Sequence, residues 1–185
     1  NYSSISMKSL VATILASAVS AACEHDHEKY HSFSHSLAQF EFDWEPYTVT
    51  TEDGYLLTMF RLQGPIGNVP VYREAKRSVL VMPGIGMSAD SWFNSPLYGE
   101  PMPIALYQAG YDVWLGNNRG THHSLKHMEL DHVHDAEEYW NFSFAEMGER
   151  DLPAMMKTIK YTAQQDVDNP RILHSDKLLY IGYDQ

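Results

Sequence analysis

The last residues of the sequence have the form of a turn that presents a catalytic nucleophile. A short apolar run, residues 178–181, leads into Gly182-Tyr183-Asp184-Gln185, the start of a G-x-nucleophile-x-G pattern. In such a turn the middle residue stands clear of the strand, and the backbone N–H of the following residue points at the oxyanion formed in acyl transfer. The pattern therefore predicts Asp184 at the nucleophile position and the N–H of Gln185 as an oxyanion donor.

A second oxyanion donor is expected from the loop after an earlier apolar run. Residues 78–82 (SVLVM) are followed by Pro83-Gly84-Ile85-Gly86. Because the second N–H of such an oxyanion hole comes from a loop that follows another strand, the sequence predicts the N–H of Ile85 in this role.

Alternating strand and helix patterns must position these two loops. Residues 47–51 and 55–62 flank Glu52-Asp53-Gly54 and predict a β-hairpin. The apolar runs 78–82, 111–115 and 177–181 are typical of strands buried in a parallel sheet. Helices are predicted over 103–108 and 151–165, the second with Asp151 as N-cap and Pro153 in its first turn. The sequence thus predicts an α/β fold with a mostly parallel sheet.

Several stretches carry a family resemblance. Residues 109–120 (AGYDVWLGNNRG), 138–148 (EYWNFSFAEMG), 151–153 (DLP) and 179–182 (LYIG) resemble the acid lipase and steryl-ester hydrolase family. Residues 45–55 (EPYTVTTEDGY) resemble that family's N-terminal lipase-associated region. The resemblance covers residues 41–185 almost continuously. It implies an α/β-hydrolase fold and hydrolysis of triacylglycerols or steryl esters by a Ser-His-Asp triad without a cofactor. The implied partner is a lipid ester, presented at a membrane or lipid-droplet surface.

The sequence departs from the family pattern at the active centre. In the family, the turn that presents the nucleophile, called the nucleophile elbow, carries His and then Ser, whereas this chain has Tyr183 and Asp184. In addition, Pro83 replaces the His expected before the oxyanion-loop glycine. The triad acid and His are expected after the elbow, whereas His174 and the other histidines precede it. The sequence therefore predicts the N-terminal part of an α/β-hydrolase, truncated at the elbow and inactive as given, with an unpaired, association-prone edge strand.

Two other functions remain open. A carboxylate that attacks an ester carbonyl forms an anhydride, whereas an activated serine forms a stable acyl-ester. Since Asp184 is therefore unsuited to ester hydrolysis, one alternative is a non-catalytic pseudo-hydrolase or lipid-binding module. A carboxylate nucleophile such as Asp184 also suits attack on an sp³ carbon, as in hydrolases that resemble epoxide hydrolases and haloalkane dehalogenases.

The N-terminal region resembles a processed leader. Residues 1–6 have no evident role, and residues 7–22 combine Lys8, an apolar run and small residues, the pattern of a cleaved signal peptide. The apolar run is shorter than the roughly 20 residues that span a bilayer. We therefore expect a secreted or lysosomal protein with a His-rich polar leader over 23–40, a lipase region over 41–185, and a glycosylation site at Asn141 of the sequon Asn141-Phe-Ser143.

Composition and the remaining motifs exclude other classes of partner. The net charge of −11 and the absence of a Lys/Arg run exclude nucleic acid, and Cys23 is the only cysteine, so no intramolecular disulfide forms. Residues 27–31 match the H-E-x-x-H zinc pattern and residues 84–89 the G-x-G-x-x-A nucleotide pattern, but both lack the required flanking elements.

The remaining histidines and large aromatic residues are assigned structural roles. We predict that one group of histidines lies in a polar surface loop and binds no metal: His122, His123, His127, His132 and His134. Trp114, Trp140 and Phe142 are predicted to be core residues.

Overall fold

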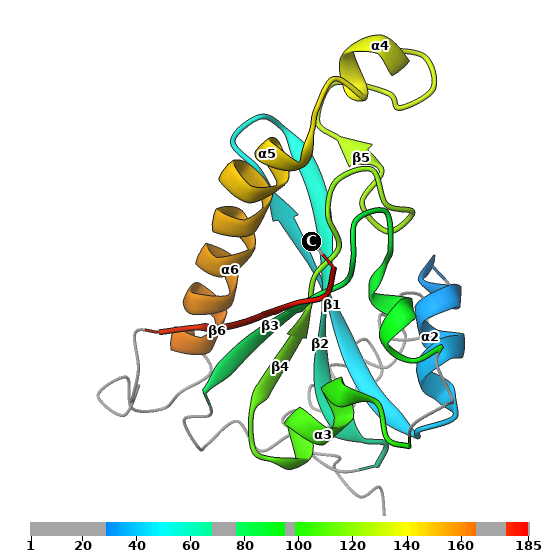
Figure 1. The fold of residues 1–185 in the computed structure, drawn as a ribbon, viewed down its shortest axis with the longest axis vertical. Coiled ribbons are helices and arrows are strands. Elements are labelled where there is room, and N and C mark those ends of the chain that lie inside the picture. Colours follow the sequence, from blue (N-terminus) through cyan, green and yellow to red (C-terminus); the bar gives the residue numbers. More distant parts are fainter. Residues whose placement is uncertain (1–28, 68–76, 95–98, 166–176, 185) are drawn as a thin grey trace, which may run out of the picture.

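A mixed β-sheet runs through the part of the chain that this computed structural model describes, residues 29–67, 77–94, 99–165 and 177–184. The strand order is β1-β2-β4-β3-β6, and the short strand β5 pairs with β2 (Figure 1). The strands are β1 (Phe42–Thr50), β2 (Tyr55–Pro65), β3 (Ser78–Met82), β4 (Asp112–Leu115), β5 (Lys126–His127) and β6 (Leu179–Gly182).

The predicted hairpin is confirmed, and it is longer than the β-rich runs alone indicate. Strands β1 and β2 are antiparallel and pair from Phe42↔Pro65 to Thr50↔Leu56. The turn uses Gly54 at a φ of 91°, a left-handed conformation that glycine adopts without strain. The His127 ring lies so close that a Cβ at Gly54 would stand 2.8 Å from its Nε2 atom, so a side chain at this position would displace β5.

The predicted parallel strands are also present. Strand β3 pairs in parallel with β4 and with β6, while β4 pairs antiparallel with β2. Strands β3 and β4 are buried almost throughout, as their apolar runs predict. The prediction that β6 is a buried strand is wrong, because its residues alternate between half-buried and exposed. Among the described strands only β3 pairs with β6, which leaves its other edge uncovered.

Helices α3 (Met102–Gln108) and α6 (Leu152–Gln165) confirm the predicted helices. The prediction that Asp151 caps α6 is wrong, because a helical path already begins at α5 (Phe144–Glu146) and continues through the π-turn η3 (Met147–Asp151). The cap is Ser143, which forms a capping box with Glu146. The π-turn ends two residues before Pro153, whose missing N–H cannot complete a regular helical bond to the preceding turn, which is consistent with the irregularity.

Two apolar clusters cover the two faces of the sheet. Val79 and Val81 of β3 belong to the cluster that packs under α2 (His31–Ala38), η1 (Ala89–Trp92) and α3. Leu80 and Met82 of the same strand belong to the cluster under α6. Successive side chains of a strand point to opposite faces, so one short apolar run supplies both cores (Figure 1).

Helix α2 corrects the prediction of a polar leader over residues 23–40. Phe33 and Leu37 of α2 are fully buried, and the Phe33 ring stacks on Phe60 of β2 at a centroid distance of 3.9 Å. Its histidines face outward, which explains why composition alone indicated a solvated segment. The proposed signal peptide and residues 1–6 lie outside the described residues.

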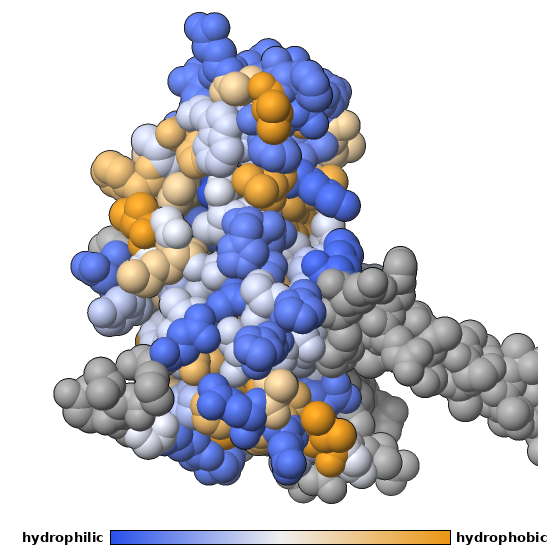
Figure 2. Space-filling model, turned by 90° about the vertical axis from the view of Figure 1, so that its right-hand side faces the viewer, coloured by the Kyte–Doolittle hydropathy of each residue, from blue (hydrophilic) through white to orange (hydrophobic). Residues whose placement is uncertain are grey.

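The surface that carries α2 and β5 is mainly hydrophilic, with hydrophobic atoms in small separate groups (Figure 2). No helix among the described residues has both the length and the apolar composition needed to cross a membrane.

Candidate functional site

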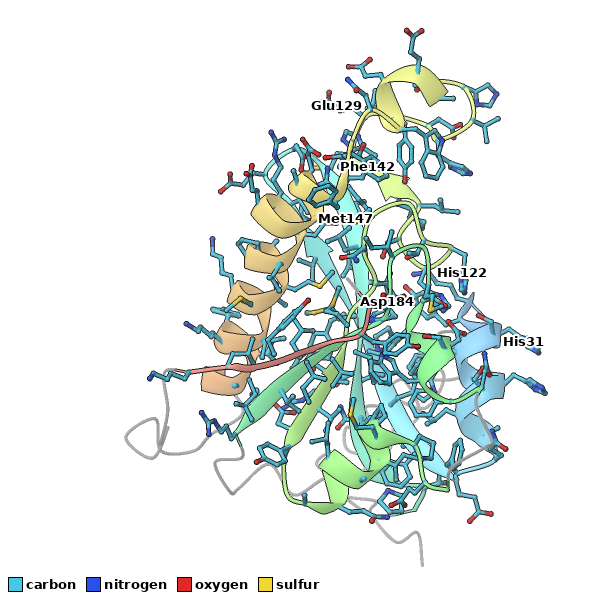
Figure 3. All side chains as sticks on the ribbon, in the orientation of Figure 1. His31, His122, Glu129, Phe142, Met147 and Asp184 are labelled. Atoms are coloured by element: carbon cyan, nitrogen blue, oxygen red, sulfur yellow. The ribbon has the colours of Figure 1, made fainter. Side chains whose placement is uncertain are left out.

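Three loops meet where the parallel strands end. Strand β3 leads into residues 83–87, β4 into residues 116–124, and β6 into Tyr183 and Asp184. Because the carboxyl ends of parallel strands lie at one edge of a sheet, these loops form the edge at which α/β folds bind ligands. Figure 3 shows Asp184 at the end of β6, with Met147 toward one side and His122 toward the other.

The turn after β6 contains a residue in the left-handed region, a feature that is compatible with the predicted nucleophile elbow. Asp184 adopts a φ of 46°, in a left-handed region that is uncommon for non-glycine residues and that Asp enters more readily than most. The Tyr183 N–H donates to the Met82 carbonyl at 3.2 Å, which anchors the turn to the end of β3. Asp184 itself is exposed, as a nucleophile at this position must be.

The oxyanion loop lies directly against this turn. A Cβ built on Gly84 would stand 3.3 Å from the Tyr183 carbonyl oxygen and 3.6 Å from that of Asp184. The contact at 3.3 Å is tighter than most Cβ contacts, so a side chain at Gly84 would push the two backbones slightly apart. The neighbouring Ile85 is 56% exposed, and its N–H has no acceptor among the described residues, so it stays a candidate donor.

An apolar pocket of about 210 Å³ opens beside the elbow. Its lining joins Met82 and Ile85 of the β3 end to Tyr180 of β6 and to the helix that starts at Phe144. A second pocket of about 280 Å³ shares Ile85 and Met147 with the first and is bounded by Trp140 and Phe142. These volumes fall below the roughly 300–1,000 Å³ of typical ligand sites, so each accommodates a segment of a lipid and not the whole molecule.

A complete catalytic triad is not present among the described residues. No described histidine forms a hydrogen bond or ion pair with the Asp184 carboxylate. The proposed oxyanion donor Gln185 and His174 both lie outside the described residues. The elbow and Ile85 are therefore brought together, but the structure assigns Asp184 no catalytic partner within the part it describes.

Sequence reasoning missed a buried ionic network behind the site. Arg119, which is 2% exposed, donates from Nε to Asp151 Oδ1 at 2.8 Å and from its backbone N–H to Asp151 Oδ2 at 3.0 Å. Its Nη1 and Nη2 atoms bind the two oxygens of Asp53 in the hairpin turn at 2.7 and 3.0 Å. The guanidinium also lies over the Tyr55 ring at 4.0 Å. This network fixes the loop after β4 to the hairpin and to the start of α6.

The network shifts the pKa values of Asp53 and Arg119 toward their charged forms, whereas the pKa of Asp151 is raised toward the neutral form. Burial acts to raise the pKa of Asp53, but hydrogen bonds from Arg119 and Thr51 hold it well below its ordinary value. Burial acts to lower the pKa of Arg119, but Asp53 and Asp151 raise it. Burial raises the pKa of Asp151, and the hydrogen bonds from Arg119 oppose that rise.

The prediction that the histidines occupy a polar surface loop is correct for His134 and wrong for His123. His134 is exposed and pairs with Asp131 on the same loop, with Nδ1 and Oδ1 3.0 Å apart. His123 is buried, and its Nε2 atom lies 2.7 Å from Asp90 Oδ2. His127 has a structural role, since its Nε2 atom lies 2.8 Å from the Asp53 carbonyl. Burial and the neighbouring His123 lower the pKa of His122.

The predicted core aromatic residues are divided between core and surface. Trp114 is fully buried, as predicted, and Phe142 packs partly buried against the core under α6. Trp140 is 44% exposed, which makes the core prediction wrong for it. Together Trp140 and Phe142 contact Gly120, where an added Cβ would stand 2.7 and 2.9 Å from their rings.

The structure describes the two weaker motifs to different extents. His31 sits on the exposed side of α2 and stacks on His35 at 6.0 Å, while the first two residues of the zinc-like motif lie outside the described residues. Residues 84–89 form a turn that leads into the single 3₁₀ turn η1. Asn141 of the sequon is exposed, so the acceptor amide is accessible.

Comparison with known proteins gives one consistent group of relatives. Residues 33–96 match the family described as the partial alpha/beta-hydrolase lipase region, which includes most of α2. Lipase lipl-1 of Caenorhabditis elegans is 35% identical over 185 residues, which cover 97% of this chain and 42% of that protein. Gastric triacylglycerol lipase of Mus musculus is 35% identical over 153 residues, 82% of this chain and 35% of that protein.

The chain thus spans about two fifths of the length of these lipases or less. Lipase member J of Homo sapiens is 33% identical over 162 residues, 83% of this chain and 38% of that protein. The solved esterase Pf2001 of Pyrococcus furiosus overlays with a TM-score of 0.42 at 19% identity, over 80% of this chain and 44% of the esterase, too little overlap to support a functional argument.

Proposed function

We propose that this chain, which belongs to the acid lipase family of α/β-hydrolases, binds a lipid carboxylic ester at the carboxyl edge of its sheet. Asp184 prevents hydrolysis of the bound ester. The observation that supports this proposal is the exposed Asp184, held at a φ of 46° on the elbow beside an apolar pocket.

The binding half of the proposal rests on the lining of the carboxyl edge. Phe144 and Ile85 are 75% and 56% exposed and line the pocket beside the elbow, although burial of such side chains is favourable. An acyl chain that enters this pocket covers both of them. The ester carbonyl then lies toward the elbow and toward the N–H of Ile85.

The loss of turnover follows from the chemistry of a carboxylate nucleophile. Attack of an Asp184 oxygen on the ester carbonyl, with expulsion of the alkoxide, gives a mixed anhydride that is less stable than the ester consumed. A serine at this position forms an acyl-ester of stability similar to the substrate, provided that a histidine accepts its proton. We therefore assign this chain to the lipase lineage as an ester-binding scaffold.

The experiment that tests turnover uses the full product of the gene that encodes this chain, with residue 184 as Asp and as Ser. Hydrolysis of a p-nitrophenyl ester at the rate of the blank by the Asp form supports the proposal. A greater rate for Asp184→Ser locates the lost step at the nucleophile. Ester hydrolysis by the Asp form that disappears in Asp184→Asn overturns the proposal.

Binding is measured separately, by displacement of a fluorescent fatty-acyl probe. Phe144→Ala is expected to weaken displacement, because it removes an exposed wall of the pocket. Met128→Ala is the matched control, since Met128 is 67% exposed and lines neither pocket beside the elbow. Equal affinities in the two variants argue against the pocket as the acyl site.

We further propose that the protein enters the secretory pathway, as the leader pattern over residues 7–22 and the exposed Asn141 indicate. Expression in a secretory eukaryotic cell tests this localisation. The expected result is protein in the medium or in lysosomes, with a glycan that is lost in Asn141→Gln. Retention of unglycosylated protein in the cytosol contradicts it.

A further inference from the structure

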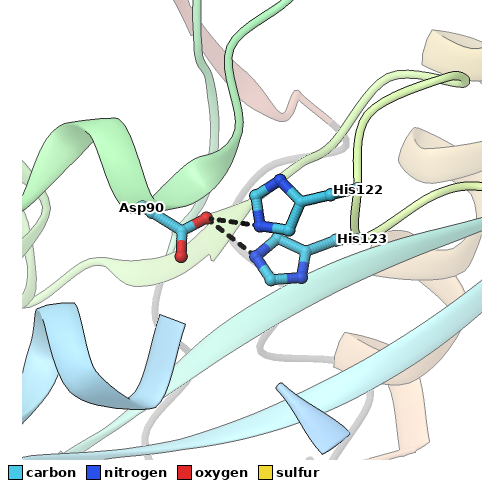
Figure 4. Close-up of side chains that lie close together, drawn as sticks. All are labelled: Asp90, His122 and His123. Atoms are coloured by element: carbon cyan, nitrogen blue, oxygen red, sulfur yellow. Dashed lines mark hydrogen bonds and ion pairs between the residues drawn. The ribbon is translucent and has the colours of Figure 1, made fainter. Parts of the chain in front are cut away.

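Three side chains with metal-binding atoms converge on the side of the sheet that carries α2. His123 Nε2 lies 2.7 Å from Asp90 Oδ2, and His122 Nε2 lies 3.5 Å from the same oxygen (Figure 4). One ligand atom from each of the three residues falls within 4.8 Å of the other two. The two histidines are adjacent in sequence, and their ring centroids are 3.8 Å apart.

The surrounding structure holds two of these side chains in place. Asp90 belongs to η1, which is fixed to the loop after β4 by a hydrogen bond from the Ala89 N–H to Asn117 Oδ1 at 2.9 Å. The backbone carbonyl of His123 accepts from Thr58 Oγ1 at 2.7 Å, and its ring meets the edge of Phe60 at 5.0 Å. The side chains of Asp90 and His123 are only 8% and 4% exposed, so both are fixed before any ligand arrives.

An ion pair alone does not account for the arrangement. The Asp90 Oδ1 atom is buried and has no hydrogen-bond partner among the described residues. Asp90 Oδ2, which faces both imidazoles, also accepts from Ser88 Oγ at 2.5 Å. An unsatisfied buried acceptor costs roughly 1–3 kcal/mol, so Oδ1 lacks a partner that a bound ligand would supply. The second imidazole is also surplus, since His123 already satisfies Asp90 Oδ2.

The spacing of the donor atoms suits a tetrahedral metal ion. Zinc binds imidazole nitrogen and carboxylate oxygen at roughly 2.0–2.1 Å, which places tetrahedral donor atoms roughly 3.3 Å apart. The observed separations of 2.7 and 3.5 Å lie on either side of that value, and all three donor atoms lie within 4.8 Å of one another, so the three side chains have only to adjust around the ion. Two imidazoles and one carboxylate are also the protein ligand set of known catalytic zinc sites, in which the fourth position stays open.

We propose that Asp90, His122 and His123 form a zinc site in this chain. His122, whose side chain is 53% exposed, provides the entry side, and water or the Ser32 hydroxyl, 3.1 Å from His122 Nε2, supplies the fourth ligand. The ion joins η1 to the loop after β4, and it also joins α2 when Ser32 is the fourth ligand. Because Trp92 of η1 contacts the Tyr183 ring at a centroid distance of 6.0 Å, zinc also braces the element that lies against the elbow.

A second group of histidines makes a controlled experiment necessary. His31 and His35 lie one turn apart on the exposed side of α2, a spacing at which two imidazoles also hold a metal weakly. Other histidines lie outside the described residues. Detection of bound zinc alone therefore does not identify the site. The site is identified by the substitution that abolishes zinc binding.

The test is calorimetric titration of the metal-free 185-residue chain with ZnCl₂. One zinc ion per chain is expected to bind in the tightest class of sites. His122→Gln is expected to lower the zinc affinity of this class at least about tenfold, because mutation of residues that only hydrogen-bond to a metal ligand already costs roughly 10–100-fold in affinity. Asp90→Asn is expected to do the same. His122→Gln is the primary variant because the exposed His122 ring supports little of the core.

Matched controls separate this site from the others. His134→Gln removes an exposed histidine that pairs with an acidic residue, and it is expected to leave the affinity unchanged. The double variant His31→Gln/His35→Gln is expected to retain the tight site. Co²⁺ substitution supplies an independent readout, since the visible spectrum of a tetrahedral site is expected in the parent chain and is lost in His122→Gln. Equal zinc affinity in the parent chain and His122→Gln, or loss confined to the α2 double variant, overturns the proposal.

Discussion

Arg119 and Asp151 are 32 positions apart in sequence, yet Nη2 of the first lies 2.7 Å from Oδ1 of the second, with both side chains almost fully excluded from solvent. The pair ties the loop after β4 to the first turn of α6. Since the candidate site is made of that loop and the helical segment before α6, the position of its pockets depends on this contact. The same guanidinium reaches the hairpin turn through Asp53.

Replacement of Arg119 by Met is expected to lower the free energy of unfolding by about 3–5 kcal/mol, because it leaves the buried Asp151 carboxylate without its counter-charge. Chemical denaturation measures the change. Arg150→Met is the matched control, since Arg150 also binds Asp53 but is 45% exposed, and its loss is expected to cost at most about 1 kcal/mol. Equal costs in the two variants would show that burial does not set the strength of the network.

The low pKa of Asp53 predicts a specific dependence of stability on pH. A carboxylate whose pKa is depressed by folding stabilises the protein above its unfolded pKa of about 3.9, and this contribution is lost as pH falls through the folded pKa. The difference in unfolding free energy between the parent chain and Asp53→Asn is therefore expected to be constant near neutral pH and to shrink below about pH 4. Asp151, whose raised pKa acts in the opposite direction, is present in both proteins. A constant difference at all pH values would contradict the pairing.

Gly116 is expected to tolerate no side chain. A Cβ at this position would overlap the Met82 sulfur and stand 3.0 Å from that of Met155, and both methionines are buried in the core under α6. Gly116→Ala should destabilise the protein by about 1–3 kcal/mol through overpacking. Gly148→Ala is the control in a helical turn with no atom near the added Cβ, and it should stabilise by roughly 0.5–1 kcal/mol. Thermal unfolding compares the two, and destabilisation by both would point to a backbone effect instead.

Ser143 has two separable roles. Its hydroxyl accepts from the Ala145 N–H at 3.1 Å as the helix cap, and it is also the third residue of the proposed glycosylation sequon. Ser143→Ala is expected to cost about 1 kcal/mol of stability even in unglycosylated protein from bacteria. Ser143→Thr should retain both the cap and the sequon, whereas Asn141→Gln removes only the glycan site. A stability loss in Ser143→Ala that appears only relative to the glycosylated parent, and not relative to the parent from bacteria, would assign the effect to the glycan.

The elements that could be predicted from sequence are those with a local signal. Residues 78–82 form a continuous apolar run, and β3 has the same bounds. The hairpin follows from β-rich runs on both sides of Asp53 and Gly54, and the elbow follows from a glycine after a strand. The cap of the helix before α6 was missed although Ser143 and Glu146 have the spacing of a capping box, because Asp151 before Pro153 gave a competing local signal.

The sequence by itself therefore determined the α/β order of elements, the turn after the last strand that carries Asp184 and the family resemblance, since each depends on neighbouring residues or on a recognisable motif. Only the tertiary structure decided that Arg119 meets Asp53 and Asp151, that α2 is part of the core, and that Asp90 converges with His122 and His123. The physical reason is that the side chains in these contacts are fixed by packing between elements distant in sequence. Neither the composition nor the periodicity of the sequence indicates which polar residues become buried together when these elements pack.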